Sequence, residues 1–282
     1  MAMELNHPFR MALYAVISPN FSSAIWWMGA LYGLYLVLLC GEFTALMIGS
    51  RRFSFIFGLL GFVAAISAHS NLGAVFGLLE ARHYWYGSYL PIYFILSALV
   101  SGGALTALIV YFNHRARGLA LSPDYHYFML MIGKLQAMFI GTLMFFITWK
   151  IIPGLYGHPP DKYEATMALI AGPLAFNFWF FEVLVGMLIP FLLLITPRTR
   201  TPFGVTVAGL LCTIGIFFMR YDLVIAGQLV PMRESVAEGP SQLLHYFPSL
   251  AEMAIVVAAV AFCLFLYTLA EKFLPMEGGH RD

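Results

Sequence analysis

The sequence predicts an all-α fold, a polytopic transmembrane helix bundle with about seven spans. Two observations carry this prediction. Of the 282 residues, 61% are hydrophobic and 10% are charged, whereas soluble domains carry roughly 25% charged residues. The apolar residues also gather in runs that reach the roughly 20 residues needed to cross a bilayer. Lipid is therefore the expected solvent for most of the surface.

Seven apolar stretches are candidates for the spanning helices. They cover residues 22–49, 53–79, 88–113, 124–150, 165–196, 203–229 and 244–273. Short breaks separate them, at Arg51-Arg52, Arg82-His83, Arg115 with Arg117, Pro159-Pro160, Arg198 with Arg200, and Pro231 to Pro240. These breaks leave no room for a soluble domain.

Small residues and prolines inside the stretches predict how the helices pack. Gly73 and Gly77 form a GxxxG, and Gly102-Gly103 follows in the next stretch, which favours close contact between helices. Pro173 and Pro190 lie inside the fifth stretch. Because proline removes a helical N–H donor, both should kink that helix.

Counting Lys and Arg predicts the orientation in the membrane. One side carries Arg51, Arg52, Arg115, Arg117, Arg198 and Arg200, with Lys272 and Arg281 near the C-terminus. The opposite side carries Arg10, Arg82, Lys150, Lys162 and Arg233, offset by Glu80, Asp161, Glu164, Glu234 and Glu238. We therefore expect a multi-pass protein of the cell inner membrane with a cytoplasmic C-terminus. The N-terminus then faces outward without a secretory signal, which suggests an odd number of spans missing upstream.

Charge and cysteine content argue against several other classes. A net charge of +1 provides no basic face for nucleic acid. Cys40, Cys212 and Cys263 are scattered through apolar stretches without a CxxC pair, and we interpret them as buried small hydrophobic residues. The sequence contains no recognisable metal-site or iron–sulfur motif.

Six ionisable residues lie inside the apolar stretches: Glu42, His69, Lys134, Glu182, Arg220 and Asp222. Each costs roughly 2.5–3.5 kcal/mol to insert, so pairing or a wet cavity is expected. His69, Asn71, Arg220 and Asp222 fall toward the outer ends of their helices. Glu42 and Lys134 fall in the cytoplasmic halves, and Glu182 near the middle. The polar residues thus cluster near the outer surface, and the titratable residues continue from there toward the cytoplasm. This arrangement suits a quinone head-group site with a proton route.

Simpler interpretations of these residues stay open. His69 suits a structural histidine that bonds a backbone carbonyl, and Glu42 with Lys134 suits a buried packing pair. Arg220 suits an interfacial anchor, and the aromatic run around Glu182 suits lipid or core packing. Since Arg220 and Asp222 are two residues apart, they point different ways and need partners on other helices.

Two other functions are alternatives. A haem b membrane anchor needs axial ligands, usually two histidines facing across a bundle, and His69 is the only histidine well inside a stretch. A secondary transporter explains buried charges, but such proteins often break helices in paired positions. The proline kinks of the fifth stretch have no matching helix break in the first half of the chain.

Several segments, taken in chain order, resemble the NrfD/PsrC family of polysulfide reductase-type membrane subunits. They are Glu42-Phe43, His69 to Gly73, Tyr84-Trp85, Leu90 to Ala98, Trp179 to Pro190, Arg220 to Val224, and Tyr246 to Glu252. The likeness is nearest to the ten-span branch that includes HybB and DsrP.

This resemblance implies a quinone-reactive subunit of an oxidoreductase complex, without haem or an iron–sulfur cluster of its own. It implies menaquinone or ubiquinone as redox partner, an iron–sulfur ferredoxin-like subunit and further redox subunits as protein partners, and a role in anaerobic respiration or sulfur metabolism. We expect no activity from the chain alone.

The resemblance also assigns site residues and a domain plan. His69 and Asn71 match residues of the family's quinone site, and Arg220 and Asp222 match a polar motif of the family. Tyr84 and Trp85 suit the mouth of the quinone site, because their amphipathic rings favour the membrane interface. Glu42 and Glu182 match acidic residues of a proton route, to which we add Lys134. The plan is one membrane domain, 1–282, with 1–80 the remainder of a first four-helix bundle, 86–230 a second, and 243–273 the final span. Residues 6–20 resemble the stretch after the family's third span, so the first three helices are expected to be absent.

Overall fold

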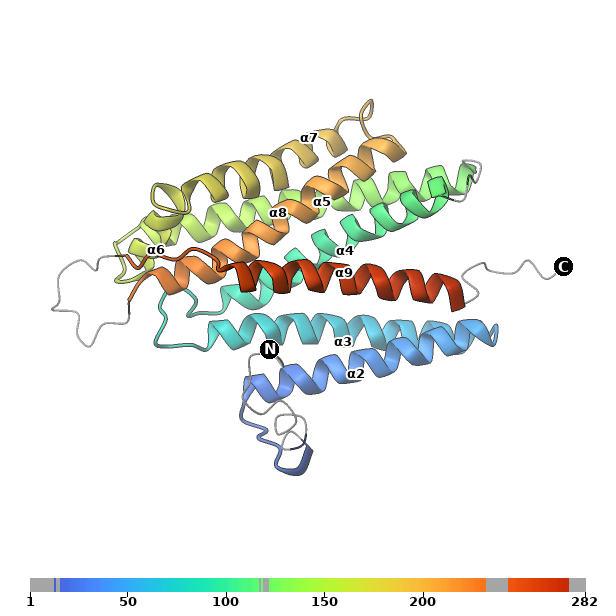
Figure 1. The fold of residues 1–282 in the computed structure, drawn as a ribbon, viewed down its shortest axis with the longest axis horizontal. Helices are drawn as coiled ribbons and strands as arrows, with labels where there is room; N and C mark the ends of the chain where they lie inside the picture. Colours follow the sequence, from blue (N-terminus) through green and yellow to red (C-terminus); the bar gives the residue numbers. More distant parts are fainter. Residues whose placement is uncertain (1–12, 14–15, 117, 119–121, 232–242, 274–282) are drawn as a thin grey trace. The chain divides into compact units, whose positions relative to one another are not determined.

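The computed structural model describes residues 13, 16–116, 118, 122–231 and 243–273, and these residues confirm the all-α fold (Figure 1). Seven of its helices are long and apolar enough to cross a membrane, and the protein is a multi-pass integral membrane protein. Some charges used to predict the orientation lie outside the described residues, namely Arg10, Arg117, Arg233, Glu234, Glu238 and Arg281.

The chain divides into two compact units, 1–243 and 244–282. In the described part of the first unit, the helices are α2 (Ala24–Met47), α3 (Arg51–Gly77), α4 (Tyr89–Ala116), α5 (Pro123–Leu155), α6 (Lys162–Ile170), the π-helix η2 (Asn177–Leu188), α7 (Ile189–Ile195) and α8 (Pro202–Leu229). The second unit contains α9 (Leu250–Phe273).

Local sequence explains where the helices begin and turn. Ser122 precedes α5, where its hydroxyl accepts from the Tyr125 N–H at 3.1 Å, and a proline fills the first helical position. The Thr201 hydroxyl caps α8 in the same way. Between α2 and α3, Gly49 has a φ of +78°, a left-handed conformation that glycine adopts without a side-chain clash.

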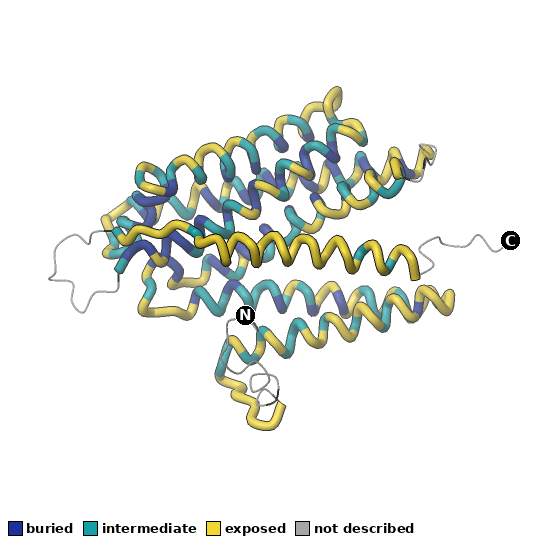
Figure 2. The backbone as a smooth tube through the Cα atoms, in the orientation of Figure 1, coloured by how far each residue is buried: buried dark blue, intermediate teal, exposed yellow. Residues whose placement is uncertain are grey.

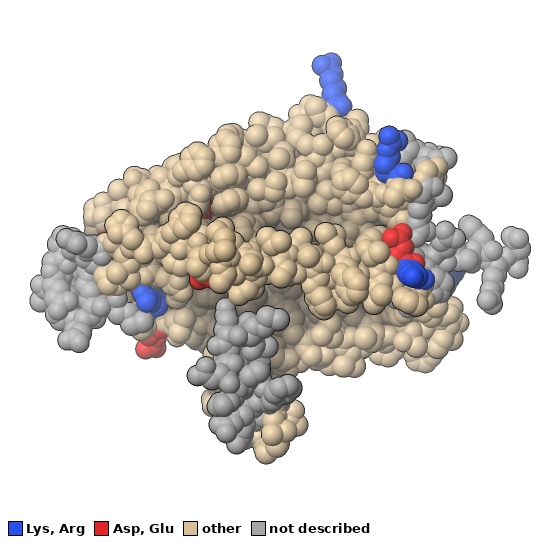
Figure 3. Space-filling view, viewed as in Figure 1, with Lys and Arg blue, Asp and Glu red and all other residues tan. Residues whose placement is uncertain are grey.

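The core of the first unit lies among α4, α5, α6, η2, α7 and α8. Figure 2 shows buried backbone running through these helices, whereas α2 is exposed or half-buried over nearly its whole length. α2 packs on α3, and α3 packs on α4. In the view of Figure 3, few Lys, Arg, Asp and Glu side chains are visible, and most of them lie near the ends of helices.

The predicted GxxxG contact is confirmed. A Cβ atom at Gly73 would lie 2.5 Å from the Leu90 oxygen, and one at Gly77 would lie 2.6 Å from the Gly87 oxygen. The backbones of α3 and of the turn into α4 therefore touch where only glycine fits. Gly102, by contrast, has open space around its Cα.

The fifth predicted stretch, 165–196, is not one helix. α6 ends at Ile170, the chain turns through Gly172 and Pro173, and the membrane-length segment is Asn177–Ile195, formed by η2 and α7. The predicted interruption at Pro173 is thus a full break. Pro190 stays within the helix, where Ile189 N–H bonds the Leu184 oxygen five residues back.

Candidate functional site

Ionisable and polar side chains gather in two places within the first unit. One is a groove between α2, α3 and α4 that contains His69, here called the His69 groove. The other is a buried set formed by Lys150, Glu182 and Asp222, here called the lysine–carboxylate cluster. Different helices build the two places, so each is described in turn.

The His69 groove has a volume of about 340 Å³. Besides His69, its lining includes Tyr35, Phe62, Ser101 and several aliphatic side chains of α3 and α4. The His69 ring meets the ring of Tyr32 edge to face, with centroids 5.7 Å apart. An apolar groove with a few polar groups is the usual form of a site for a small organic ligand.

One hydrogen bond fixes the chemistry of His69. Its Nδ1 lies 2.9 Å from the backbone oxygen of Ala65. A carbonyl oxygen only accepts hydrogen bonds, so Nδ1 must carry the proton. In the neutral ring, Nε2 is then the acceptor and presents a lone pair. His69 is therefore a structural histidine through Nδ1, which bonds a backbone carbonyl, while Nε2 can still bond a ligand.

Arg220 of α8 lies behind this groove. Its Nη2 donates to the Ser97 hydroxyl at 3.2 Å, and its guanidinium carbon lies 5.8 Å from the centre of the Phe94 ring. Tyr32 lies within its electrostatic range. His69, Tyr32 and Arg220 therefore form a series of neighbouring polar groups that crosses from α3 to α8.

Asn71 contributes to the fold rather than to the groove lining. Its side-chain amide donates to the Ala24 oxygen at 2.8 Å. Ala24 is the first residue of α2, so this bond fastens α3 to the start of α2. The groove lining contains His69 but not Asn71.

The lysine–carboxylate cluster lies inside the bundle of α5, η2 and α8. Glu182 is 3% exposed and Asp222 is 1% exposed. Lys150 lies within electrostatic range of both carboxyl groups. The Lys150 ammonium lies 4.7 Å from the centre of the Tyr84 ring and 5.5 Å from that of Tyr93, which is cation–π geometry.

Close packing of η2 against α8 brings Glu182 and Asp222 together. A Cβ atom at Gly186 would lie 2.5 Å from the Cα of Gly215, so the two helices meet backbone to backbone. Glu182 precedes Gly186 by four residues and so lies on the same side of the helix. π-helical turns are rare and often occur at functional sites, and Glu182 lies within one.

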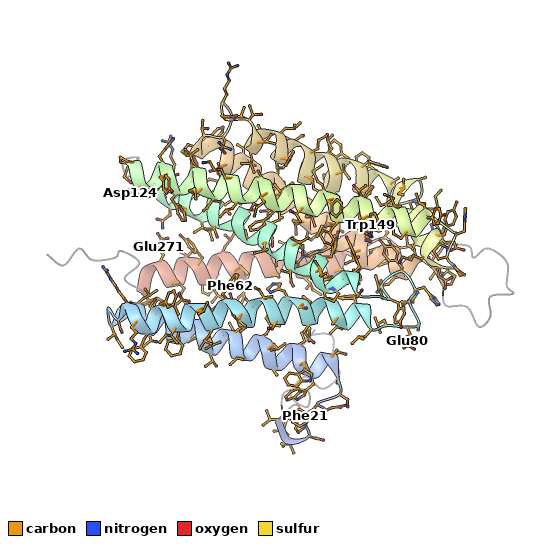
Figure 4. All side chains as sticks on the ribbon, turned by 180° about the vertical axis from the view of Figure 1, so that it is seen from behind. Phe21, Phe62, Glu80, Asp124, Trp149 and Glu271 are labelled. Carbon is orange, nitrogen blue, oxygen red and sulfur yellow. The ribbon has the colours of Figure 1, made fainter. Side chains whose placement is uncertain are left out.

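A second pocket opens beside the cluster at one end of the first unit. Its volume is about 160 Å³, and its lining includes Tyr84, Trp85, Lys150 and Lys162. We call it the outer pocket. Its lining also includes Trp149, which Figure 4 shows at the same end of the helices as Glu80 and far from Asp124.

The loop between α3 and α4 holds the outer pocket in place. The Trp85 indole N–H donates to the Leu223 oxygen at 2.8 Å, and the Arg82 guanidinium donates to the Val230 oxygen at 2.6 Å. Both bonds fasten the loop to the end of α8. Tyr84 is buried between them, and burial together with the nearby carboxyl groups raises the pKa of its phenol.

Sequence reasoning missed the role of Lys150. It counted this residue among the charges on the side opposite the cytoplasm, as the last residue of the predicted span 124–150. In the structure α5 continues through Pro153 to Leu155, and Lys150 points into the bundle. The signal that could have found it is a lysine next to a continuous apolar run, three residues before Pro153.

Glu42 and Lys134 lie in neither place. Glu42 lines a separate, open groove of about 620 Å³ near Arg51, and Lys134 is exposed on α5. The two do not form the buried packing pair considered above, because Lys134 is not buried. Among the residues that the structure describes, no group of three or more His, Cys, Asp or Glu side chains could hold a metal ion.

Comparison with known proteins agrees with this architecture. A model of the family described as polysulphide reductase, NrfD, matches residues 1–232. Similar proteins include a subunit of the selenate reductase of Mesobacillus selenatarsenatis, which is 28% identical over 83% of this chain and 54% of that protein. The Hdr-like menaquinol oxidoreductase integral membrane subunit of Archaeoglobus fulgidus is 27% identical over 91% of this chain and 66% of that protein.

A third relative, from Halobacterium salinarum, is named as a membrane subunit of dimethyl sulfoxide reductase. It is 26% identical over 78% of this chain and 53% of that protein. The chain thus spans between about half and two-thirds of the length of these relatives. Because the family model matches most of the chain, the protein belongs to the NrfD family.

Proposed function

We propose that this protein is a membrane subunit of a respiratory electron-transfer complex that exchanges electrons and protons with a membrane quinone, menaquinone or ubiquinone. Family membership supports the proposal, as does the likeness to a menaquinol oxidoreductase subunit. An iron–sulfur ferredoxin-like subunit and further redox subunits carry the electrons onward. The chain contributes no haem or iron–sulfur cluster and is not active alone.

The proposed setting is the cell inner membrane, with a cytoplasmic C-terminus and a DsrP-like role in sulfur metabolism or anaerobic respiration. Selenate and dimethyl sulfoxide reductases among the relatives differ in the substrate that their names give. The substrate chemistry therefore belongs to partner subunits, and this chain supplies the step shared by all of them, contact with the quinone pool.

His69 carries the proposal. It lines an apolar groove that is large enough for an aromatic head group, and it keeps Nε2 for a ligand because Nδ1 is already bonded. Tyr35 and Ser101 add hydroxyl groups to the same lining. Of the residues predicted to bind quinone, His69 lines this groove, and Arg220 supports it from behind through Tyr32.

The tautomer of His69 favours the reduced form of the ligand. Oxidation of a quinol releases two electrons and two protons. A lone pair on Nε2 accepts a hydrogen bond from a quinol hydroxyl and can then take its proton, whereas a quinone carbonyl offers no donor to that lone pair. We therefore propose that His69 is the base for quinol oxidation.

The other predicted residues have different places in this proposal. Tyr84, Trp85 and Asp222 belong to the outer pocket or the lysine–carboxylate cluster, and Asn71 fastens α2. A proton route through Glu42, Lys134 and Glu182 stays a prediction. We also keep the proposal that 86–230 forms the second four-helix bundle of the family.

Substitution of His69 in the assembled complex tests the proposal. In His69→Ala, quinol-linked turnover should fall by roughly 10²–10⁴-fold, the usual contribution of a positioned base. His69→Gln retains a hydrogen-bond acceptor but cannot take the proton, so it should keep KM nearer to wild type while kcat stays low. Electron transfer from an artificial donor to the partner subunits should be unchanged.

The matched control is His126→Ala. His126 is an exposed histidine near the start of α5, at the opposite end of that helix from Lys150. It should leave turnover unchanged. Turnover at the wild-type rate in His69→Ala, in a complex that has assembled fully, would refute the assignment of His69.

A further inference from the structure

We propose that Lys150, Glu182 and Asp222 form a binding site for one exchangeable proton inside the bundle, reached from the outer pocket. This site is separate from the His69 groove, shares no residue with it and needs no quinone to bind its proton. The proposal rests on the charges that these side chains bring together, on the burial of the two carboxyl groups and on a pocket whose lining includes Lys150.

The charges in the cluster do not balance. Glu182 and Asp222 contribute two carboxyl groups, both almost fully buried, and Lys150 contributes one ammonium. With all three ionised, one negative charge is left over in a low-dielectric interior. An uncompensated buried charge is strongly unfavourable, so the cluster requires one more positive charge.

Lys150 cannot remove the imbalance, because loss of its proton would leave two negative charges in the cluster instead of one. The faces of the Tyr84 and Tyr93 rings lie against its ammonium, which stabilises the charged form. The same ammonium repels a metal cation from this space. A proton on one of the two carboxyl groups is the smallest charge that restores neutrality.

Asp222 has room for that proton. Both of its carboxyl oxygens are buried without a hydrogen bond of good geometry, and the Asn177 side chain is a neighbour that interacts with the carboxyl group. The buried hydroxyl of Tyr84 also lacks such a bond. These polar atoms come from α8 and from the loop between α3 and α4, and they surround the same lysine.

Other titratable groups reach the cluster from each neighbouring element. Tyr84 comes from the loop before α4, Tyr89 and Tyr93 come from α4, and Lys162 of α6 lines the outer pocket. The Tyr89 hydroxyl donates to the Phe146 oxygen at 2.9 Å. None of these groups supplies the missing positive charge next to the carboxyl groups, since Lys162 is part of the pocket lining only.

The outer pocket gives the proton a path. Lys150 belongs both to its lining and to the cluster, and Tyr84, whose ring faces the Lys150 ammonium, belongs to the lining. At about 30 Å³ for each water molecule, its volume of about 160 Å³ has space for about five waters. Thr166 and Lys162 add polar groups along this lining. Water there can exchange protons with the cluster without crossing the apolar core.

Infrared spectroscopy of the full chain, purified in lipid nanodiscs at neutral pH, tests the proposal by counting protonated carboxyl groups that shift on transfer to D₂O. Wild type should show one such buried group. Glu182→Gln or Asp222→Asn should show none, because the remaining carboxylate balances Lys150. Lys150→Met should show two, because neither carboxylate then has a cation. Asp124→Asn, which alters an exposed aspartate in the first turn of α5, should match wild type.

Three results would overturn the proposal. The first is a wild-type spectrum without a buried protonated carboxyl group. The second is a signal that persists in both Glu182→Gln and Asp222→Asn. The third is a wild-type signal that appears only when choline replaces sodium, which would assign the site to a metal cation. The wild-type measurements decide the matter even if a variant fails to fold.

Discussion

Two aromatic N–H groups show how a single hydrogen bond sets what a residue can do. The indole of Trp85 and the imidazole of His69 each donate to a backbone carbonyl, of Leu223 and Ala65 respectively. Indole has no second nitrogen, so the Trp85 side chain has no further polar atom with which to bond a ligand. Imidazole has one, so His69 can hold its place and still meet a ligand.

We expect Trp85→Phe to lower stability with little change in the His69 groove. The phenyl ring keeps part of the contact with Phe76 but leaves the buried Leu223 oxygen without its donor, at a cost of about 1–3 kcal/mol. Thermal or denaturant unfolding of the purified chain measures the loss. Trp149→Phe is the control, because Trp149 is exposed and should change stability by about 0.5 kcal/mol or less. Equal effects from the two variants would show that the bond contributes nothing.

The residue types at these sites could be predicted from the sequence, but their partners could not. An ionisable residue in an apolar run signals a function or a partner on its own, and this signal identified His69, Glu182 and Asp222. Whether a histidine bonds its own helix depends on a rotamer, which composition and spacing do not report. Lys150 was counted with the charges at the outer end of the predicted span 124–150, whereas α5 continues past it through Pro153 to Leu155.

At the scale of the elements, glycines decide which helices touch and therefore which charges meet. α3 approaches α4 at Gly73, and η2 approaches α8 where Gly186 meets Gly215. The sequence predicted the first contact through its GxxxG spacing. The second joins two glycines 29 residues apart along the chain, and no local pattern shows that they face each other.

Gly215→Ala should therefore destabilise the protein strongly. Its new Cβ would overlap the backbone of Gly186, which cannot move as a side chain can, so a loss on the order of 3 kcal/mol is expected. Gly102→Ala introduces the same methyl group into open space and should have no such effect. Differential scanning calorimetry or chemical unfolding of both variants gives the comparison. A melting temperature for Gly215→Ala equal to that of Gly102→Ala would contradict this account of the helix crossing.

The break within 165–196 marks another limit of prediction. Pro173 was expected to bend a helix, and the chain instead leaves the helix between α6 and η2. Gly172 beside it adds backbone freedom, and proline restricts the residue before it to extended conformations. Together they end α6, whereas Pro190 alone does not end the segment of η2 and α7. The positions of such residues can be read from the sequence, but whether a bend becomes a break depends on packing.

At the scale of the whole molecule, the first unit keeps its polar groups in two separate places. The His69 groove lies between α2, α3 and α4, and the lysine–carboxylate cluster lies among α5, η2 and α8. The fold class and the seven spans were predictable because each span can be recognised in the sequence by its length and hydropathy. The division of the polar residues between two places was not, since it follows from how the helices pack.

The second unit and α2 indicate that much of the apolar surface faces lipid or other protein. α9 has no buried residue, and α2 has one, Ala45. A helix that is apolar on all sides suits either surrounding. This exposure agrees with the proposal that the chain works within a complex.

The central claim is that a membrane quinone binds in the His69 groove. Photoaffinity labelling of the assembled complex with an azidoquinone, followed by peptide mass spectrometry, tests it most directly. The account predicts labels on the groove walls, within residues 62–69 of α3 and 95–105 of α4, with competition by unmodified quinone and loss of labelling in His69→Ala. Labelling confined to the outer pocket, around Tyr84 and Trp149, would contradict it.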